Sequence, residues 1–347
     1  MRIKIIVGFM VLLSWIFTGC SNTSEALENT DTFDELEELQ ETEYGDVVEV
    51  SDIAQSTEFL ETAYTKRNGI SYIANYDNLL YMTHSEVSEE QGIFCMEVGS
   101  DESKSFYDDF RNDGVPTVIT TDMDGNVYTV VRLKQEHTTT SLKLLKISPL
   151  GELLYETEFI QYADEESSVW AIAVDVDGYV YVRTAILDDV LLQVFDSDGE
   201  YVGDISDEEG TYKLIDSLGR GPEGKVYAIL TWGEEKECTD IFKMSGETLS
   251  MESEHISNMP SGVYYSAIGE SRDGNFVTYN VNYGVQIVLG NGIEAKVVSD
   301  QVAGGVEGCK SCFLADGRLL LVRQETSFVE GKYQVIGSTL YYIPFSG

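Results

Sequence analysis

Positive charge is scarce in this chain. Its 347 residues contain 22 Lys and Arg against 61 Asp and Glu, which gives a formal net charge of −39 at pH 7. A field of that sign repels nucleic acid and anionic lipid headgroups. We therefore expect no nucleic-acid partner, and we expect ligands that are neutral molecules, cations or proteins with basic patches. The alternative explanation for the charge is solubility, because acidic surfaces resist aggregation.

Cysteine and histidine are also scarce, with five and three residues. Five widely spaced cysteines do not make the disulfide framework of a small secreted domain. Cys309 and Cys312 have C-x-x-C spacing, but zinc would need two further ligands, and the histidines are scattered at positions 84, 137 and 255. We expect no metal site and no cofactor, and the pair is either reduced or a local disulfide.

Catalytic fingerprints are missing as well. The chain has no Gly-x-Ser-x-Gly elbow, no P-loop and no dinucleotide-binding glycines. Three Asp-x-Asp-Gly stretches, which begin at Asp122, Asp175 and Asp196, superficially match calcium loops. Each lacks the third upstream ligand and the Glu at position twelve that such a loop requires. We interpret them as turns and predict no catalytic residue.

The first twenty residues contain what an exported lipoprotein needs. Arg2 and Lys4 precede a mostly apolar stretch over residues 5–17, which is long enough for a signal-peptide core and short for a spanning helix. The stretch ends in Phe17-Thr-Gly-Cys20, which resembles the bacterial lipobox, although Phe17 stands where the family usually has Leu. The resemblance implies a signal peptide over residues 1–19 and a lipid anchor on Cys20. The alternative is an ordinary cleaved signal in which Cys20 is incidental.

This anchor would hold the protein at the cell membrane, facing the extracellular side, or the periplasm if the cell has an outer membrane. Residues 21–56 contain 12 acids and no Lys or Arg. We expect residues 20–45 to form the lipidated cysteine and an acidic tether, with at most a marginal helix over residues 31–41. The folded domain is then expected over residues 46–347.

A turn residue recurs before an apolar segment at intervals of 43 to 53 residues. A β-branched or aromatic strand precedes each turn and another follows it, and Asp-Gly supplies the positive φ that a tight two-residue hairpin turn requires. A third strand in each unit ends at a further glycine, after which a fourth strand is expected. The first-turn residues are Asn78, Gly125, Gly178, Gly224, Gly274 and Gly317, and the later glycines are Gly99, Gly151, Gly199, Gly246, Gly292 and Gly347.

Four strands per unit at this period indicate a β-propeller blade. Six units fit residues 69–347, and the absence of a long helical period argues against an α/β fold. We therefore predict an all-β, six-bladed propeller of four-stranded blades. The last unit stops at the turn glycine Gly347, so its fourth strand must come from elsewhere. We predict that residues 46–52, which alternate correctly, supply it from the N-terminal side.

The turns resemble those of extracellular propellers with six to eight blades. The residues that carry this are Asp124-Gly-Asn-Val-Tyr128, Asp177-Gly-Tyr-Val-Tyr181 and Tyr341-Tyr-Ile-Pro344. They are also similar to the N-terminal propeller of some Firmicutes lipoproteins, in which a substrate-binding domain of the ABC-importer type follows. That resemblance implies saccharide or solute capture linked to an importer, but this chain ends where the second domain would begin.

Aromatic residues near strand starts offer a binding option. Trp170, Trp232, Tyr264 and Tyr283 would stack on sugar rings if they are exposed at a rim, and would pack between blades otherwise. Two hypotheses follow: a monomeric cell-surface module that binds a protein or a saccharide, and a channel-centred enzyme of the lactonase or lyase type. Three or more carboxylates, Asn or His side chains gathered in a central channel would favour the enzyme.

Overall fold

The computed structural model describes the strands and most of the tight turns. The described residues are 61–65, 70–84, 92–109, 114–133, 140–162, 167–186, 189–205, 214–221, 223–232, 238–253, 265–270, 276–280, 284–288, 295–299, 310–314, 318–329 and 332–343. The predicted signal peptide, Cys20, the tether and residues 46–52 lie outside these ranges.

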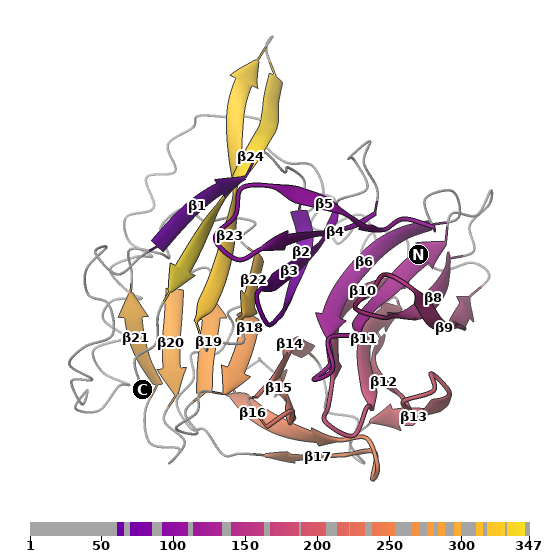
Figure 1. Cartoon of the computed structure of the whole chain (residues 1–347). Helices are drawn as coiled ribbons and strands as arrows, with labels where there is room; N and C mark the ends of the chain where they lie inside the picture. The colour runs from indigo at the N-terminus through magenta and orange to yellow at the C-terminus, as the bar shows by residue number, and fades with distance from the viewer. Residues whose placement is uncertain are drawn as a thin grey trace, which may run out of the picture. The chain divides into compact units, whose positions relative to one another are not determined.

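The described residues form 24 strands and six four-stranded antiparallel sheets (Figure 1). The first three sheets follow chain order, each strand pairing with the next. The first sheet comprises β2 (Ile70–Tyr76), β3 (Leu79–His84), β4 (Ile93–Glu97) and β5 (Ser103–Tyr107). The second comprises β6 (Gly114–Thr121), β7 (Val127–Leu133), β8 (Thr140–Ile147) and β9 (Leu153–Tyr162). The third comprises β10 (Ser167–Val174), β11 (Val180–Ile186), β12 (Asp189–Phe195) and β13 (Tyr201–Ile205).

The fourth and fifth sheets repeat this arrangement, and the last sheet differs. The fourth comprises β14 (Leu214–Arg220), β15 (Val226–Trp232), β16 (Cys238–Ser245) and β17 (Ser250–Ser253). The fifth comprises β18 (Tyr265–Glu270), β19 (Phe276–Asn280), β20 (Gly284–Val288) and β21 (Ala295–Ser299). The last comprises β22 (Lys310–Phe313), β23 (Leu319–Val329), β24 (Lys332–Ile343) and, at its outer edge, β1 (Glu61–Thr65).

An N-terminal strand therefore completes the last sheet, but it is not the predicted one. β1 pairs antiparallel with β24 from Glu61↔Tyr342 to Thr65↔Ser338, whereas the prediction placed residues 46–52 there. Because only four residues separate β1 from β2, the closing strand leads directly into the first sheet. Alternation selected the wrong segment, since Glu61–Thr65 does not alternate regularly but lies closer in the chain to the first strand of the next sheet.

The first strands of the sheets form a closed circuit. β2 contacts β6, β6 contacts β10, and the contacts continue through β14, β18 and β22 back to β2. Tyr342 of β24 also accepts a hydrogen bond on its hydroxyl from the amide of Gly99 in the first sheet, at 3.0 Å. The fold is an all-β propeller with four-stranded blades.

The blade turns have the predicted glycine but a different length. In the second sheet, the Asp122 amide donates a hydrogen bond to the Asn126 carbonyl at 3.0 Å and so closes the hairpin. Gly125 within this loop has a φ of +83°. Three residues therefore form the loop, with the glycine in the left-handed region at its third position, as in a type I turn with a bulge. The two-residue turn was the wrong prediction for this blade. The same three-residue loop recurs at residues 148–152, 175–179, 196–200 and 221–225.

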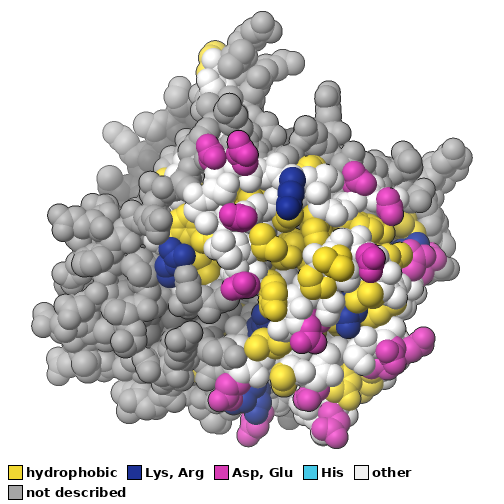
Figure 2. Space-filling model, in the orientation of Figure 1, with side chains coloured by type: hydrophobic (Ala, Val, Ile, Leu, Met, Phe, Trp, Pro, Cys, Tyr) yellow, Lys and Arg dark blue, Asp and Glu magenta, His cyan; other side chains and the backbone are white. Residues whose placement is uncertain are grey.

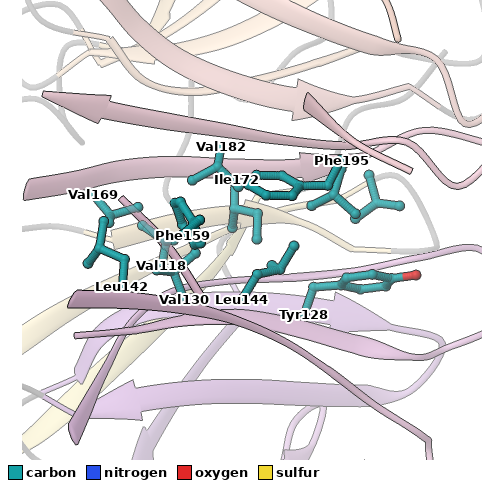
Figure 3. Packing of buried hydrophobic residues seen from close by; sticks show 12 residues of the cluster. Val118, Tyr128, Val130, Leu142, Leu144, Phe159, Val169, Ile172, Val182 and Phe195 are labelled. Atoms are coloured by element: carbon teal, nitrogen blue, oxygen red, sulfur yellow. The ribbon is translucent and has the colours of Figure 1, made fainter. Parts of the chain in front are cut away.

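The hydrophobic core lies between neighbouring blades. One cluster joins the second and third sheets through residues such as Leu142, Leu144, Ile172 and Phe195 (Figure 3). Other clusters join the first sheet to the second, the third to the fourth, and the last to the first. A strand in such a blade is covered on both faces, which explains the near-continuous apolar runs in β7 and β15.

The chain divides into two compact units. One contains Met1–Glu43 and Thr326–Gln334, and the other contains Tyr44–Glu325 and Val335–Gly347. The contacts analysed below all lie within the second unit. The described residues contain no helix that is long and apolar enough to cross a membrane.

Candidate ligand-binding site

Each blade has two chemically different ends. The antiparallel order places the first-to-second and third-to-fourth turns at one end, which we call the turn end. The first strand of every blade begins at the opposite end, which we call the loop end. Most connections at the loop end lie outside the described residues.

At the turn end of the second blade, Asp122 organises the hairpin. Its Oδ1 accepts the amides of Asp124 and Asn126, both at 2.9 Å, and its Oδ2 accepts the Asn126 side-chain amide at 2.8 Å. The Tyr128 hydroxyl donates to the same Oδ2 at 3.1 Å. Burial, together with the charge of Asp122, raises the pKa of Tyr128. The carboxylate is thus occupied by four donors of its own hairpin, which confirms the interpretation of this stretch as a turn.

The third blade repeats this arrangement. Asp175 Oδ1 accepts the amides of Asp177 and Tyr179, at 3.0 and 2.9 Å, and the Tyr181 hydroxyl donates to Oδ2 at 2.7 Å. Burial raises the pKa of Asp175, and its hydrogen bond from Tyr181 opposes that shift. Tyr181 is fully buried. We call each such unit, Asp122 with Tyr128 and Asp175 with Tyr181, an Asp–Tyr lock.

The first blade lacks the lock. Its turn is a two-residue one, with Tyr76 paired to Leu79, and the side-chain amide of Asn75 donates to the carbonyls of Asp77 and Leu79 at 3.0 and 2.8 Å. The hydroxyl of Tyr81, which is fully buried, has no hydrogen-bond partner. Burial raises the pKa of Tyr81 to about 12.

Arg220 crosses between blades that are not neighbours. It is the last residue of β14 in the fourth blade, and its Nη1 donates to the carbonyl of Thr121 in the second blade, at 2.6 Å. In the circuit of first strands, β10 of the third blade lies between β14 and β6. The Arg220 guanidinium therefore reaches Thr121 on the inner side of β10. Burial lowers the pKa of Arg220, and the charge of Asp122 opposes the shift. The backbone and the nearby carboxylate hold this cation at the turn end.

Apolar side chains also reach the surface at the turn end. Met123 and Val176, which follow the two lock aspartates, are 46% and 58% exposed. On the face shown in Figure 2, hydrophobic side chains of the described residues lie among scattered acidic groups and a few basic ones. Val176 packs on the turn glycine Gly224 of the next blade and donates its amide to the Gly224 carbonyl at 2.8 Å. This contact joins one blade to the next.

Towards the loop end, five of the six first strands carry a bulge. The pairing register shifts between Ile70 and Tyr72 in β2 and between Val169 and Ala171 in β10, so that Ser71 and Trp170 are the extra residues. The equivalent shift in β6 lies between Pro116 and Ile119, so that Thr117 and Val118 are both unpaired, and those in β14 and β18 occur at Asp216 and Ser266. Bulges re-aim side chains and are frequent next to functional sites. The described part of the last blade begins at Lys310, one residue after the equivalent position.

Trp170 is the bulged residue of the third blade and is half-buried. The guanidinium of Arg183, which is only 4% exposed, lies 5.2 Å from the centroid of the Trp170 ring. A cation over an indole face is an attractive contact, and it is stronger where water is excluded. Arg183 therefore contacts the indole from within the blade, while Trp170 as a whole retains exposed area.

The other predicted ligand-binding residues are less fully described. Trp232 ends β15 and pairs with Cys238, so that it belongs to the loop end of the fourth blade. Tyr264 and Tyr283 lie outside the described residues, directly before the first residues of β18 and β20. Of the four, the structure gives a side-chain environment for Trp170 alone, and all four stay predictions as ligand contacts.

One cysteine of the C-x-x-C pair and the acidic residues can be assessed in the described ranges. Cys312 lies in β22 as a free thiol, and burial raises its pKa, which makes it a poor nucleophile. Its C-x-x-C partner Cys309 lies outside the described residues. Among the residues that are described, no three His, Cys, Asp or Glu side chains gather as metal ligands would.

The comparisons with known proteins show the fold. No protein-family model matches the chain, and no curated protein matches it. Among solved structures, the chain is similar to a gluconolactonase from Xanthomonas campestris, with 11% identity, a TM-score of 0.53, and coverage of 87% of this chain and 98% of that one. It is also similar to a structural-genomics target proposed to be a gluconolactonase, with 11% identity, a TM-score of 0.52, and coverage of 86% and 97%.

A Lactobacillus plantarum protein is 15% identical with a TM-score of 0.43, over 78% of this chain and 87% of that one. The likeness to the two structures with TM-scores above 0.5 establishes a shared propeller architecture and nothing about activity.

Sequence reasoning missed the bulges and both arginines. A bulge is a matter of register, and a single sequence shows no register. Arg183 did leave a signal, because it is the one charged residue in the otherwise apolar and hydroxyl-bearing run from Val180 to Thr184. A charge within a strand that is buried on both faces needs a partner, and the nearby Trp170 is one such partner.

Proposed function

We propose that the protein is a lipid-anchored binding module of the cell surface. Cys20 would carry the lipid, residues 1–19 would be the removed signal, and residues 20–45 would form the acidic tether. The propeller over residues 46–347 would present its loop end to a saccharide, a solute or a protein. The net charge of −39 favours neutral or cationic partners over nucleic acid.

We further propose that the six four-stranded sheets are the six blades of one closed, monomeric propeller. The contact of β22 with β2 and the pairing of β1 with β24 support closure. A closed ring leaves only short, protected strand edges around its centre, which makes it a stiff support for loops.

The observation that carries the binding proposal is Trp170. It is an aromatic side chain on a bulge, half-buried, with Arg183 stacked against it from inside the blade. A tryptophan whose role is only to fill the core is covered by its neighbours, whereas binding sites combine a fixed aromatic face with a few polar groups. At the turn ends of the second and third blades, by contrast, the carboxylates of Asp122 and Asp175 accept hydrogen bonds from their own hairpins.

A thermal-shift screen of the full-length protein against neutral sugars, divalent ions and peptides tests the binding proposal. A ligand that binds the folded state alone raises the melting temperature by mass action. A broad panel without any shift contradicts small-molecule binding. Palmitate labelling of the wild type and of the Cys20→Ser variant tests the anchor separately: label on the wild type only is expected, and equal labelling contradicts it.

The second candidate function is hydrolysis of a lactone at the centre of the propeller. Its support is the likeness to the two structures with TM-scores above 0.5, one a gluconolactonase and one proposed to be. An assay with glucono-1,5-lactone, with and without added divalent cations, separates the candidates. Turnover above the uncatalysed rate favours the enzyme.

A further inference from the structure

The outer strands of the second and third blades begin in the same way. After the turn glycine, each has a glutamate and then two apolar residues, in Gly151-Glu-Leu-Leu154 and Gly199-Glu-Tyr-Val202. β9 and β13 each pair with one strand only, so they are the outer edges of their sheets. In both strands the pairing register shifts at the second apolar residue, so that Leu154 and Val202 are the extra residues of two bulges.

Each bulge leaves two successive apolar side chains exposed. In a regular strand, successive side chains point to opposite faces of the sheet, and a bulge interrupts that alternation. Leu153 and Leu154 are 42% and 51% exposed, and Tyr201 and Val202 are 51% and 40% exposed. Together with Leu150 in the preceding turn, they make up five of the eight large hydrophobic residues that are exposed in the described parts of the chain. The exposed apolar surface is therefore concentrated and not scattered.

The two segments lie against each other. A Cβ placed on Gly199, in the turn before β13, would lie 2.5 Å from the ring of Tyr155 in β9. The Phe195 ring, which is fully buried, has its centroid 5.0 Å from that of Phe159 in β9 and 5.8 Å from that of Tyr201. Tyr201 is thus an exposed ring that is held from below by the core. We call the following five exposed residues the edge patch: Leu150, Leu153, Leu154, Tyr201 and Val202.

The edge patch is surrounded by negative charge. Residues 148–158 and 196–205 contain no Lys or Arg. The lysines on the neighbouring strand β8 already have partners, since Lys143 Nζ lies 3.1 Å from Glu156 Oε1 and Lys146 Nζ lies over the Tyr128 ring. The exposed acids of the two segments are Glu152, Glu156, Glu158, Asp198, Glu200 and Asp204.

We propose that the edge patch docks a protein surface whose apolar side chains are flanked by Lys and Arg. An exposed apolar patch with a polar border is typical of a protein–protein contact, and an aromatic ring such as Tyr201 is the kind of residue that dominates binding energy there. The acids select a cationic partner and accelerate its encounter. This surface lies apart from Trp170 and adds to the proposed function without depending on it.

Charge argues against the other occupants of the edge patch. A second copy of the chain would bring the same acids to the contact, at a net charge of −39 on each copy. Residues 21–56 of the chain itself contain 12 acids and no Lys or Arg, so they would be repelled as well. An anionic lipid surface is repelled for the same reason. A basic protein surface is the occupant that complements both the apolar and the charged part.

Fluorescence anisotropy with designed peptides tests the inference on the full-length protein in a zwitterionic detergent, with detergent alone as the blank. The probe is a labelled peptide of alternating lysine and leucine. One control peptide has serine in place of every leucine, and another has glutamate in place of every lysine. The lysine–leucine peptide should bind at least about tenfold more tightly than either control, because each control lacks one of the two matching features.

Paired variants locate the binding. Leu154→Ser combined with Val202→Ser should weaken the lysine–leucine peptide about tenfold, whereas Phe328→Ser, which changes an exposed apolar residue of β23, should bind as the wild type does. Glu200→Lys should weaken binding by about threefold or more, and Glu102→Lys, at an exposed acid of the first blade, should not. All four substitution sites are exposed apolar or acidic residues, and melting temperatures show that each variant is folded.

Three outcomes would overturn the inference. The first is wild-type affinity in the Leu154→Ser, Val202→Ser variant, or no binding of the lysine–leucine peptide to the wild type. The second is equal binding of the serine-containing peptide, which would mean that charge alone attracts the probe. The third is self-association of the wild type that the double variant loses in sedimentation, which would assign the edge patch to a second copy. None of these outcomes bears on ligand binding at Trp170.

Discussion

The two ends of the blades use their polar residues differently. At the turn end, Asp122 accepts four hydrogen bonds from its own hairpin and Asp175 accepts three. At the level of the bulges, Trp170 retains exposed area and is held from behind by Arg183. The most conspicuous motif in the sequence therefore stabilises the fold, and the inconspicuous bulged residues are the candidates for binding. Variants at the turn end should change stability and leave affinity unchanged, and a variant at Trp170 should do the reverse.

Asp122→Ala should give the largest effect. The change leaves the buried Tyr128 hydroxyl and two turn amides without their acceptor, and we expect a loss of about 4 kcal/mol in the free energy of unfolding. Urea denaturation measures it. Asp124→Ala is the control, because its side chain makes none of these bonds and should cost less than about 0.5 kcal/mol. An equal loss in the free energy of unfolding of the two variants would contradict a stabilising role of the Asp–Tyr lock.

Gly125→Ala should be next. Gly125 has φ of +83°, and a Cβ there would meet the ring of Tyr76 in the first blade, at 2.6 Å. We expect a loss of about 3 kcal/mol from backbone strain and overpacking together. Gly99→Ala has the same strain at φ of +81° with no heavy atom within 4 Å, and should cost about 1 kcal/mol. Thermal unfolding of the two variants measures the difference in stability. An equal loss in both would mean that the contact between Gly125 and the Tyr76 ring is not tightly packed.

Removing single tyrosine hydroxyls compares three blades directly. Tyr128→Phe and Tyr181→Phe each lose a bond to a carboxylate and should be destabilised by about 1.5 kcal/mol. Tyr81→Phe removes a buried hydroxyl that has no partner, so it should be neutral or stabilising by up to about 1 kcal/mol. Denaturant midpoints of the three variants test this. If Tyr81→Phe lost as much stability as the other two variants, the hydroxyl of Tyr81 could not be the one without a hydrogen-bond partner.

The smallest effect should be a pH dependence from Asp175. Burial raises its pKa in the folded state, so the folded state binds the proton more tightly than the unfolded chain does. This group therefore contributes a fall in stability as the pH rises from the unfolded pKa, about 4, through the raised folded value. Asp175→Asn should flatten that part of the stability profile in urea titrations at stepped pH. If the Asp175→Asn profile equals that of the wild type, or if the substitution shows that Asp175 makes stability rise with pH in this window, the predicted direction is contradicted.

The sequence was sufficient for the architecture because the turns repeat. Glycines such as Gly125 and Gly178 require positive φ and fall at blade intervals, so the strands between them follow. The closing strand was misplaced, because Glu61–Thr65 has no regular alternation and is identified as a strand by its pairing with β24. The candidate site was only partly predictable: Trp170 stood out by type, but its bulge depends on a register that a single sequence does not contain.

The division between the two ends is tested most directly by one paired titration. The best-binding neutral sugar is titrated into Trp170→Phe and Tyr181→Phe at a temperature where both are folded. The account predicts binding weakened about tenfold in Trp170→Phe, from the loss of a stacking face, and wild-type affinity in Tyr181→Phe. Wild-type affinity in Trp170→Phe together with weakened binding in Tyr181→Phe would contradict it and place the ligand at the turn end.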